Sequence, residues 1–135
     1  MIQKVTLRLN DDRNFELAGA LTLDELNPKE LLLYATAKCA GLTIVSLLKE
    51  HISEVKLMEI TLEGRLSPPT VVAESRYTHL NIIYRAECQT LKEQMVVSRA
   101  VNLAHDKYCG MVQMIRHIAP LSREISIVAT DAPTA

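Results

Sequence analysis

Apolar and polar side chains alternate at the start of the chain, which predicts that it opens with a β-hairpin. In residues 2–9 (IQKVTLRL) the odd positions from Val5 onward are apolar, whereas the even positions after Ile2 are polar. A period of two is typical of a strand with one buried face. The asparagine and aspartate residues within 10–13 favour a turn, and residues 15–23 resume an extended pattern.

A long apolar segment follows and predicts a central helix from Pro28 to about Glu50. Asn27 suits the N-cap position, and proline suits the first helical position. Apolar residues cover nearly the whole circumference of this helix, so we expect it to be covered on most sides. So small a domain can hardly supply that cover, and a partner subunit would supply it. The segment is just long enough to span a bilayer, but Lys38 lies in its middle, so a buried helix is the better interpretation.

The same patterns predict the remaining elements. In order, they are strands over 55–66 and 76–88, a helix from 91 to about 108, a shorter helix to about 118 and a strand over 123–129. A shift in the apolar phase of the first of these strands predicts a β-bulge. Thr90 and Glu93 have the spacing of a capping box. The resulting order, ββ–α–ββ–αα–β, predicts an α+β fold in a single domain over residues 1–135.

The composition narrows the classes of function. The chain has 135 residues, of which 48% are hydrophobic, 23% charged and 4% aromatic, with 15 basic and 16 acidic side chains. This balance is typical of a globular protein and lacks the strong positive charge of a nucleic-acid binder, and the scarce aromatic residues disfavour base stacking. The N-terminal segment has no secretory signal pattern. We therefore expect a cytoplasmic protein that binds neither nucleic acid nor membranes.

Three cysteines, Cys39, Cys88 and Cys109, carry the strongest chemical signal. Structural disulfides are rare in the cytosol, so burial, redox chemistry and metal binding compete as explanations. Cys88 shares its strand face with apolar residues and is predicted to belong to the core. Cys39 is either a small buried side chain or a reactive thiol. Gly41 beside it favours reactivity, because a glycine inside a helix costs about 1 kcal/mol unless close backbone approach or access to the thiol offsets the cost.

Cys109 lies at a predicted break between two helices. A thiol in the first turn of a helix faces unpaired N–H groups and the positive end of the helix dipole, which favour the thiolate. His105 and Lys107 are close in sequence and would add positive charge. The alternative is a thiol that only fills the corner between the helices. His105 and Cys109 also have the spacing of metal ligands on one helix face, but the break spoils that geometry and no CxxC or HxxxH motif accompanies them. We therefore predict neither metal nor cofactor.

The pair of Cys39 and Cys109 is more informative than either residue alone. If the fold brings them together, one thiolate can attack the O–O bond of a peroxide and become a sulfenic acid. The second thiol then condenses with the sulfenic acid to form a disulfide, which an external dithiol reduces. The first step requires a low thiol pKa, and hence an arginine near the sulfur and an acidic or polar residue that holds this arginine.

Two segments of the chain resemble a known family. NPKELLLYATAKCAGLTIVSLLKE, around Cys39, resembles the central helix of the OsmC/Ohr family of organic hydroperoxide reductases and osmotically inducible proteins. RAVNLAHDKYCGMVQMI, around Cys109, resembles the second cysteine segment of that family. The order of elements between them also fits, and the resemblance extends from residue 27 to 128. It implies an OsmC-like intertwined homodimer, in which sheets wrap two central helices and the active sites lie at the subunit interface.

The same resemblance implies roles for individual residues. Cys39 takes the peroxidatic position and Cys109 the resolving position. The substrates are small organic hydroperoxides, and the reductant is a dithiol, notably a lipoylated protein. The thiolate-stabilising arginine of the family comes from the N-terminal hairpin, where Arg13 in the turn is the first candidate and Arg8 in the strand the second. For either arginine the alternative is a solvated surface position, and Glu30 is the candidate that would hold the arginine.

The sequence departs from the family pattern near both cysteines. The acidic position of the family falls on Lys29 here, and Glu30, the next residue, is turned by about 100° around a helix. Gly110 follows the second cysteine, where the family commonly has proline. These differences indicate an outlying branch of the family. They also leave room for a non-catalytic OsmC-like protein that binds a small apolar ligand at the dimer interface.

Overall fold

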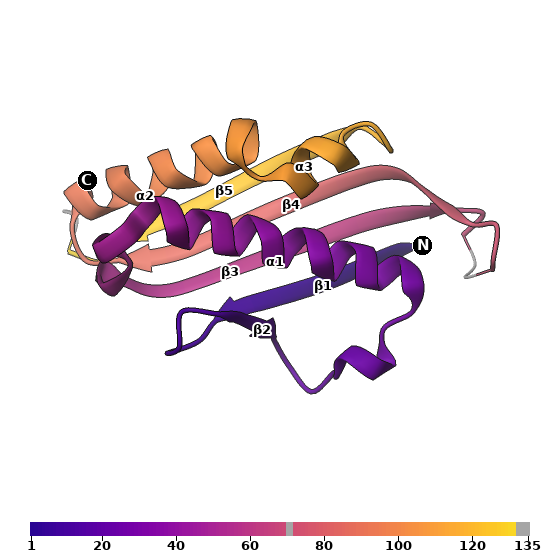
Figure 1. Cartoon of the computed structure of the whole chain (residues 1–135), viewed down its shortest axis with the longest axis horizontal. Helices are drawn as coiled ribbons and strands as arrows, with labels where there is room; N and C mark the ends of the chain where they lie inside the picture. The colour runs from indigo at the N-terminus through magenta and orange to yellow at the C-terminus, as the bar shows by residue number, and fades with distance from the viewer. Residues whose placement is uncertain (70–71, 132–135) are drawn as a thin grey trace.

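The computed structural model describes residues 1–69 and 72–131. Its strands are β1 (Ile2–Leu9), β2 (Phe15–Leu17), β3 (Val55–Ser67), β4 (Arg76–Cys88) and β5 (Leu121–Ala129). Its helices are α1 (Pro28–Leu48), α2 (Leu91–Leu103) and α3 (Gly110–Ile115), with 3-10 segments at Leu23–Glu25 and Lys49–Glu54 and a π-helical turn at Ala104–Tyr108. This order confirms the predicted α+β arrangement (Figure 1).

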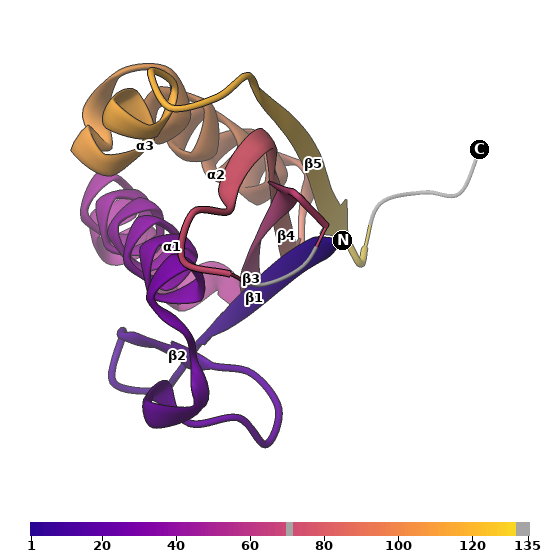
Figure 2. The same ribbon diagram turned by 90° about the vertical axis from the view of Figure 1, so that its right-hand side faces the viewer.

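The five strands form one sheet in the order β2-β1-β3-β4-β5. Neighbours from β2 to β4 are antiparallel, whereas β5 runs parallel to β4 because α2 and α3 carry the chain back along the sheet. Figures 1 and 2 show the helices on one face of the sheet, and no helix among the described residues covers the other face. The core therefore lies between the sheet and the three helices.

Strand alternation decides which side chains face this core. In β1 the side chains of Gln3, Val5 and Leu7 are buried, so Arg8 points to the opposite face of the sheet. From α1, one stripe packs onto the sheet, and its members are Leu33, Ala37, Ala40, Ile44 and Leu48. The elements of the protomer therefore cover one side of α1.

The opposite side of α1 stays open among the described residues. Leu31, Ala35, Leu42 and Ser46 are exposed and follow one another at the spacing of a single helix face. The expectation that this helix is covered on most sides is therefore not met by the protomer alone. The segment Pro28–Glu54 is long and apolar enough to cross a membrane by length and composition, a test that the core helix of a soluble protein also passes.

β4 has the predicted bounds, and alternate side chains over its second half are buried. Tyr77 is an exception, because the period of two in this strand predicts that it shares the polar face of Arg85 and Glu87, and yet it is buried. The register of β3 against β4 shifts beside it, and its ring covers Gly64 of β3. Its hydroxyl donates a hydrogen bond of 2.6 Å to Oε1 of Gln3. A second register shift lies at the start of β3, between Val55 and Leu57, just before the change of apolar phase that predicted a bulge.

The predicted hairpin is shorter than expected, since β2 ends at Leu17. The chain then turns through Gly19, which has a φ of 88°, and enters the 3-10 segment at Leu23–Glu25. Thr22 and Glu25 form a capping box there, which ends any extended structure. The last helix and strand also differ in their bounds, because α3 ends at Ile115 and β5 begins at Leu121.

Candidate active site

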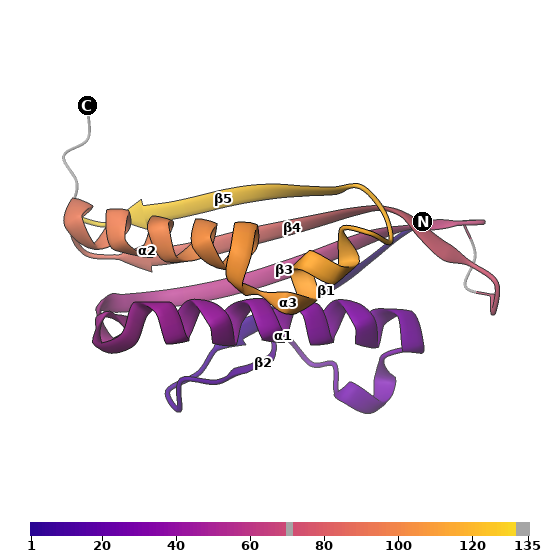
Figure 3. The ribbon, with the colours of Figure 1, turned by 45° about the horizontal axis from the view of Figure 1, so that its top comes forward.

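The fold brings the sulfurs of Cys39 and Cys109 to 3.4 Å from each other, with the Cys109 thiol donating to Cys39 Sγ. Cys39 lies in the middle of α1, and Cys109 occupies the N-cap position of α3. The two meet because α3 packs beside the middle of α1, as Figures 1 and 3 show. Both cysteines are free thiols in this structure. A disulfide requires about 2.05 Å, so only a small approach separates the pair from bonding distance.

The two thiols have different surroundings. Cys109 is completely buried, whereas Cys39 is half-buried and opens on the molecular surface. Burial raises the pKa of Cys109 to about 11, although the N–H groups of Val112 and Met111 lower it in part. The expectation of a Cys109 thiolate at a helix N-terminus is therefore wrong, because desolvation outweighs the N–H groups. Cys109 is a neutral thiol that donates a hydrogen bond.

The expected help from His105 is also absent. Burial and the positive charges of Arg123 and Arg116 lower the pKa of His105 to about 4. The imidazole is therefore neutral near pH 7 and adds no positive charge. Its Nδ1 lies 2.8 Å from the hydroxyl of Tyr84, and both side chains are buried. Sequence analysis missed this pair, because nothing in the sequence indicates that a histidine in the π-helical turn faces a tyrosine of β4.

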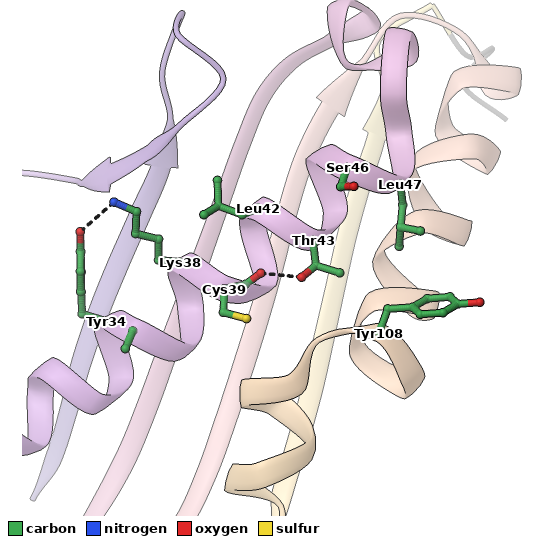
Figure 4. Close-up of a pocket in the computed structure, with 9 residues that line it drawn as sticks. Tyr34, Lys38, Cys39, Leu42, Thr43, Ser46, Leu47 and Tyr108 are labelled. Atoms are coloured by element: carbon green, nitrogen blue, oxygen red, sulfur yellow. Dashed lines mark hydrogen bonds between the residues drawn. The ribbon is translucent and has the colours of Figure 1, made fainter.

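A groove of about 700 Å³ runs along the open side of α1 past Cys39 (Figure 4). Its lining is mostly apolar and consists of Tyr34, Ala35, Lys38, Cys39, Leu42, Thr43, Ser46, Leu47 and Tyr108. Lys38 is the only lysine or arginine among these residues. Its Nζ lies 3.4 Å from the hydroxyl of Tyr34, and Figure 4 shows the side chain pointing away from the sulfur of Cys39.

Neither predicted arginine lines this groove. Arg8 lies on the outer face of the sheet, where its Nη2 pairs with Oε2 of Glu59 at 2.8 Å. Its neighbour Leu7 takes the inward position, so strand alternation directs Arg8 away from the thiol of its own chain. Arg13 is exposed in the turn between β1 and β2 and has a φ of 62°.

Glu30 performs a structural task at the start of α1. Its carboxylate accepts a hydrogen bond of 3.0 Å from the backbone N–H of Asn27, whose side chain accepts one from the N–H of Glu30. This capping box holds Glu30 in the first turn, about 13 Å along the helix axis from Cys39. The spacing of Asn27 and Glu30 is itself the sequence signal for this role. The protomer thus brings Cys39 and Cys109 together and leaves Arg13 and Glu30 outside the groove.

A metal-binding arrangement was the other chemical alternative for His105 and Cys109. Over residues 1–69 and 72–131, the structure has no group of three or more His, Cys, Asp or Glu side chains placed to hold a metal ion. The remaining cysteine, Cys88, is buried, and its thiol donates to the carbonyl of Val128 at 3.5 Å. Cys88 therefore belongs to the core, as predicted.

Comparison with known proteins gives the context of this site. Residues 21–123 match the family described as OsmC-like protein. Among individual sequences, Protein YhfA of Escherichia coli strain K12 is 29% identical over 105 residues, which cover 76% of this chain and 74% of YhfA.

Solved structures have the same fold. An OsmC-like protein from Mycoplasma pneumoniae superposes with a TM-score of 0.58 at 13% identity, covering 95% of this chain and 96% of that one. An organic hydroperoxide resistance protein, OsmC, from Legionella pneumophila superposes with a TM-score of 0.52 at 21% identity, covering 82% of this chain and 73% of that one.

Proposed function

This chain belongs to the OsmC-like protein family, and on that premise we propose that it is a thiol-dependent peroxidase that reduces organic hydroperoxides in a two-cysteine cycle. The observation that carries the proposal is the distance of 3.4 Å between the sulfurs of Cys39 and Cys109. The exposures of the two thiols suit different roles, because a peroxide can reach Cys39 from the groove while Cys109 is shielded from it. Cys39 is the peroxidatic residue, and Cys109 is the resolving residue.

In the first step the Cys39 thiolate attacks the terminal oxygen of the hydroperoxide. An S–O bond forms and the O–O bond breaks, so the sulfur is oxidised to a sulfenic acid, and the alkoxide takes up a proton and leaves as an alcohol. The apolar wall of the groove that includes Leu47 would hold the organic part of the peroxide. The neutral Cys109 thiol supports this step, because its S–H donates to the sulfur that must carry negative charge.

In the second step the Cys109 sulfur attacks the sulfur of the sulfenic acid. An S–S bond forms, the S–O bond breaks, and the departing hydroxide takes the proton of Cys109, so that water leaves. Burial raises the pKa of Cys109 to about 11, so this thiol keeps its proton until the attack. An external dithiol, such as a lipoylated protein, then reduces the disulfide to two thiols and is itself oxidised to a disulfide.

The active assembly in this proposal is a homodimer. The open stripe of α1, defined by Leu31, Ala35, Leu42 and Ser46, would be covered by a second copy of the chain. The guanidinium that a thiolate requires would then come from across the interface, and exposed Arg13 of the hairpin turn is the candidate. A cytoplasmic location is consistent with a reductant that is an intracellular dithiol.

A turnover assay tests the peroxidase proposal. The purified protein is mixed with cumene hydroperoxide and dihydrolipoamide, and peroxide loss is measured together with the oxidation state of each cysteine. We expect Cys39→Ser to abolish turnover and the control Cys88→Ser to retain activity. Without the dithiol, Cys109→Ser should consume about one peroxide per chain and stop at the sulfenic acid. Equal rates for the unmodified protein and Cys39→Ser would exclude the mechanism.

A non-catalytic role remains the second candidate, because no arginine among the described residues lines the groove and its lining is mostly apolar. In that case the groove of the dimer would hold a small apolar ligand. Binding of cumyl alcohol, a stable analogue of cumene hydroperoxide, would then be detectable by calorimetry in a protein that shows no peroxide consumption.

A further inference from the structure

The resolving cysteine follows an unusual helical turn. α2 ends at Leu103 and does not continue into α3, because residues Ala104–Tyr108 form a π-helical turn. The backbone N–H of Cys109 donates to the carbonyl of Ala104, five positions earlier, at 2.9 Å. Such turns are rare and are found frequently at functional sites. After this turn Cys109 adopts an extended conformation, with φ −82° and ψ 107°, and its sulfur meets α1.

Two side chains from the C-terminal side of Cys109 reach back to this turn. Nε2 of Gln113 donates to the carbonyl oxygen of His105 at 2.9 Å, and Nη2 of Arg116 donates to the same oxygen at 2.6 Å. Carbonyls at the end of a helix lack partners within the helix, so this oxygen is free to accept both bonds. The donor from Arg116 is charged, which makes its bond the stronger of the two. These two hydrogen bonds link the helix that follows Cys109 to the π-helical turn that precedes it.

The same turn is also fastened to the sheet. The imidazole of His105 packs edge-on against the ring of Tyr84, with centroids 5.6 Å apart, and shares the hydrogen bond of 2.8 Å with its hydroxyl. Tyr84 belongs to β4, a central strand, and is almost completely buried. On the surface side, Asp106 pairs with Arg123 of β5 at 2.9 Å. The turn is therefore held from the core and from the surface.

We propose that Tyr84, His105, Gln113 and Arg116 form a clamp that positions the Cys109 thiol for closure of the disulfide with Cys39. This inference rests on the proposed two-cysteine cycle and assigns positioning residues to its second step. The sulfurs, 3.4 Å apart, must approach to about 2.05 Å, and the clamp keeps Cys109 within that short reach. A misplacement of about 1 Å at a reacting centre lowers a rate by about 100-fold.

The clamp is tested with an aromatic disulfide reagent, which requires no peroxide. Attack by the Cys39 thiolate on 5,5′-dithiobis(2-nitrobenzoate) releases one coloured thiolate and leaves a mixed disulfide on Cys39. Attack by Cys109 on that mixed disulfide forms the Cys39–Cys109 bond and releases the second coloured thiolate, while its own proton passes to the solvent. The first phase reports access to Cys39, and the second phase reports closure.

The variants Tyr84→Phe and Arg116→Gln each remove one bond of the clamp and are compared in a Cys88→Ser background. We expect the second phase to slow by about 10- to 100-fold while the first phase changes less than about twofold. Arg116→Lys, which keeps a charged donor, should recover part of the closure rate. Arg99→Gln on the exposed side of α2 is the matched control and should close at the unmodified rate. Circular dichroism on every variant shows whether it is folded.

Two results would overturn the clamp. One is an unchanged second phase in folded Tyr84→Phe and Arg116→Gln, and the other is release of a single coloured thiolate by the unmodified protein. If disulfide closure slows in the clamp variants but the unmodified protein consumes no hydroperoxide, the clamp is supported and the peroxidase proposal is contradicted. The experiments can therefore contradict one proposal without contradicting the other.

Discussion

The ring of Phe15 packs against Gly41, so the N-terminal hairpin closes on α1 beside Cys39. A Cβ atom added to Gly41 would stand 2.5 Å from Cε2 of Phe15, closer than any side chain tolerates. The glycine inside the central helix is therefore explained by the close approach of β2. Of the two explanations that the sequence offered, close packing and access to the thiol, the structure favours packing.

Gly41→Ala should lower the free energy of unfolding by about 1–2 kcal/mol. The alanine gains about 1 kcal/mol of helix propensity, but overpacking against Phe15 costs more. Urea unfolding followed by circular dichroism measures the change. Gly110→Ala is the control, because nothing lies within 4 Å of the added Cβ there, and it should be neutral or stabilising. The effect of Gly41→Ala should shrink when it is measured against Phe15→Leu alone. An equal loss of stability on adding Gly41→Ala to Phe15→Leu and to the unmodified protein would contradict the packing explanation.

Iodoacetamide at pH 8 should modify Cys39 well before the other cysteines. Cys39 opens on the groove, whereas Cys88 and Cys109 are completely buried and burial raises the pKa of both. Peptide mass spectrometry over a time course gives the rate at each position, and we expect a difference of at least about tenfold. Unfolding in urea is the control and should make the three rates similar. Faster labelling of Cys109 than of Cys39 in the folded protein would reverse the proposed roles.

Acid should destabilise the fold through His105. Its pKa falls from 6.5 to about 4 on folding. Between pH 4 and pH 6.5, therefore, His105 is mostly protonated in the unfolded chain and mostly neutral in the folded chain. Stability attributed to this group is present above pH 6.5 and is lost as the pH falls toward 4, by up to about 3 kcal/mol. Urea unfolding at several pH values should show a smaller acid loss in His105→Gln than in the unmodified protein. Exposed His79→Gln is the control, and an identical slope in all three proteins would contradict the assignment.

Leu42→Glu should separate the proposed dimer. Leu42 is 42% exposed on the open stripe of α1, and a carboxylate there would be buried without a partner in the interface. Sedimentation equilibrium should give a dimer for the unmodified protein and a weakening of association by at least about 100-fold for the variant. Leu91→Glu, at a similarly exposed position on α2, should leave the dimer intact. A monomeric unmodified protein would exclude the proposed assembly.

The elements that the sequence predicts well are those with a single strong local signal. β4 has its predicted bounds because its apolar alternation is nearly unbroken, and α1 begins where Asn27 and Pro28 place it. The burial of Tyr77 was not predicted, because it depends on a register shift between β3 and β4. Such a shift is a property of the pairing and cannot be inferred from the sequence of one strand. The contact between Cys39 and Cys109 followed from a family resemblance, since no local pattern relates positions so distant.

Two electrostatic predictions at the candidate site are wrong for the same reason. The pairing of Glu30 with an arginine stays a prediction, because the protomer shows only its capping box with Asn27. The pKa of Cys109 was predicted in the wrong direction because a helix N-terminus is visible in a sequence and the depth of burial is not. His105 was expected to be a cation for the same reason.

The parallel pairing of β4 and β5 has a consequence for when this chemistry becomes available. Parallel neighbours require a long crossover, and here that crossover carries Cys109. Cys109 is synthesised 70 positions after Cys39. A chain interrupted before residue 109 therefore has Cys39 without the sulfur that the complete fold places beside it.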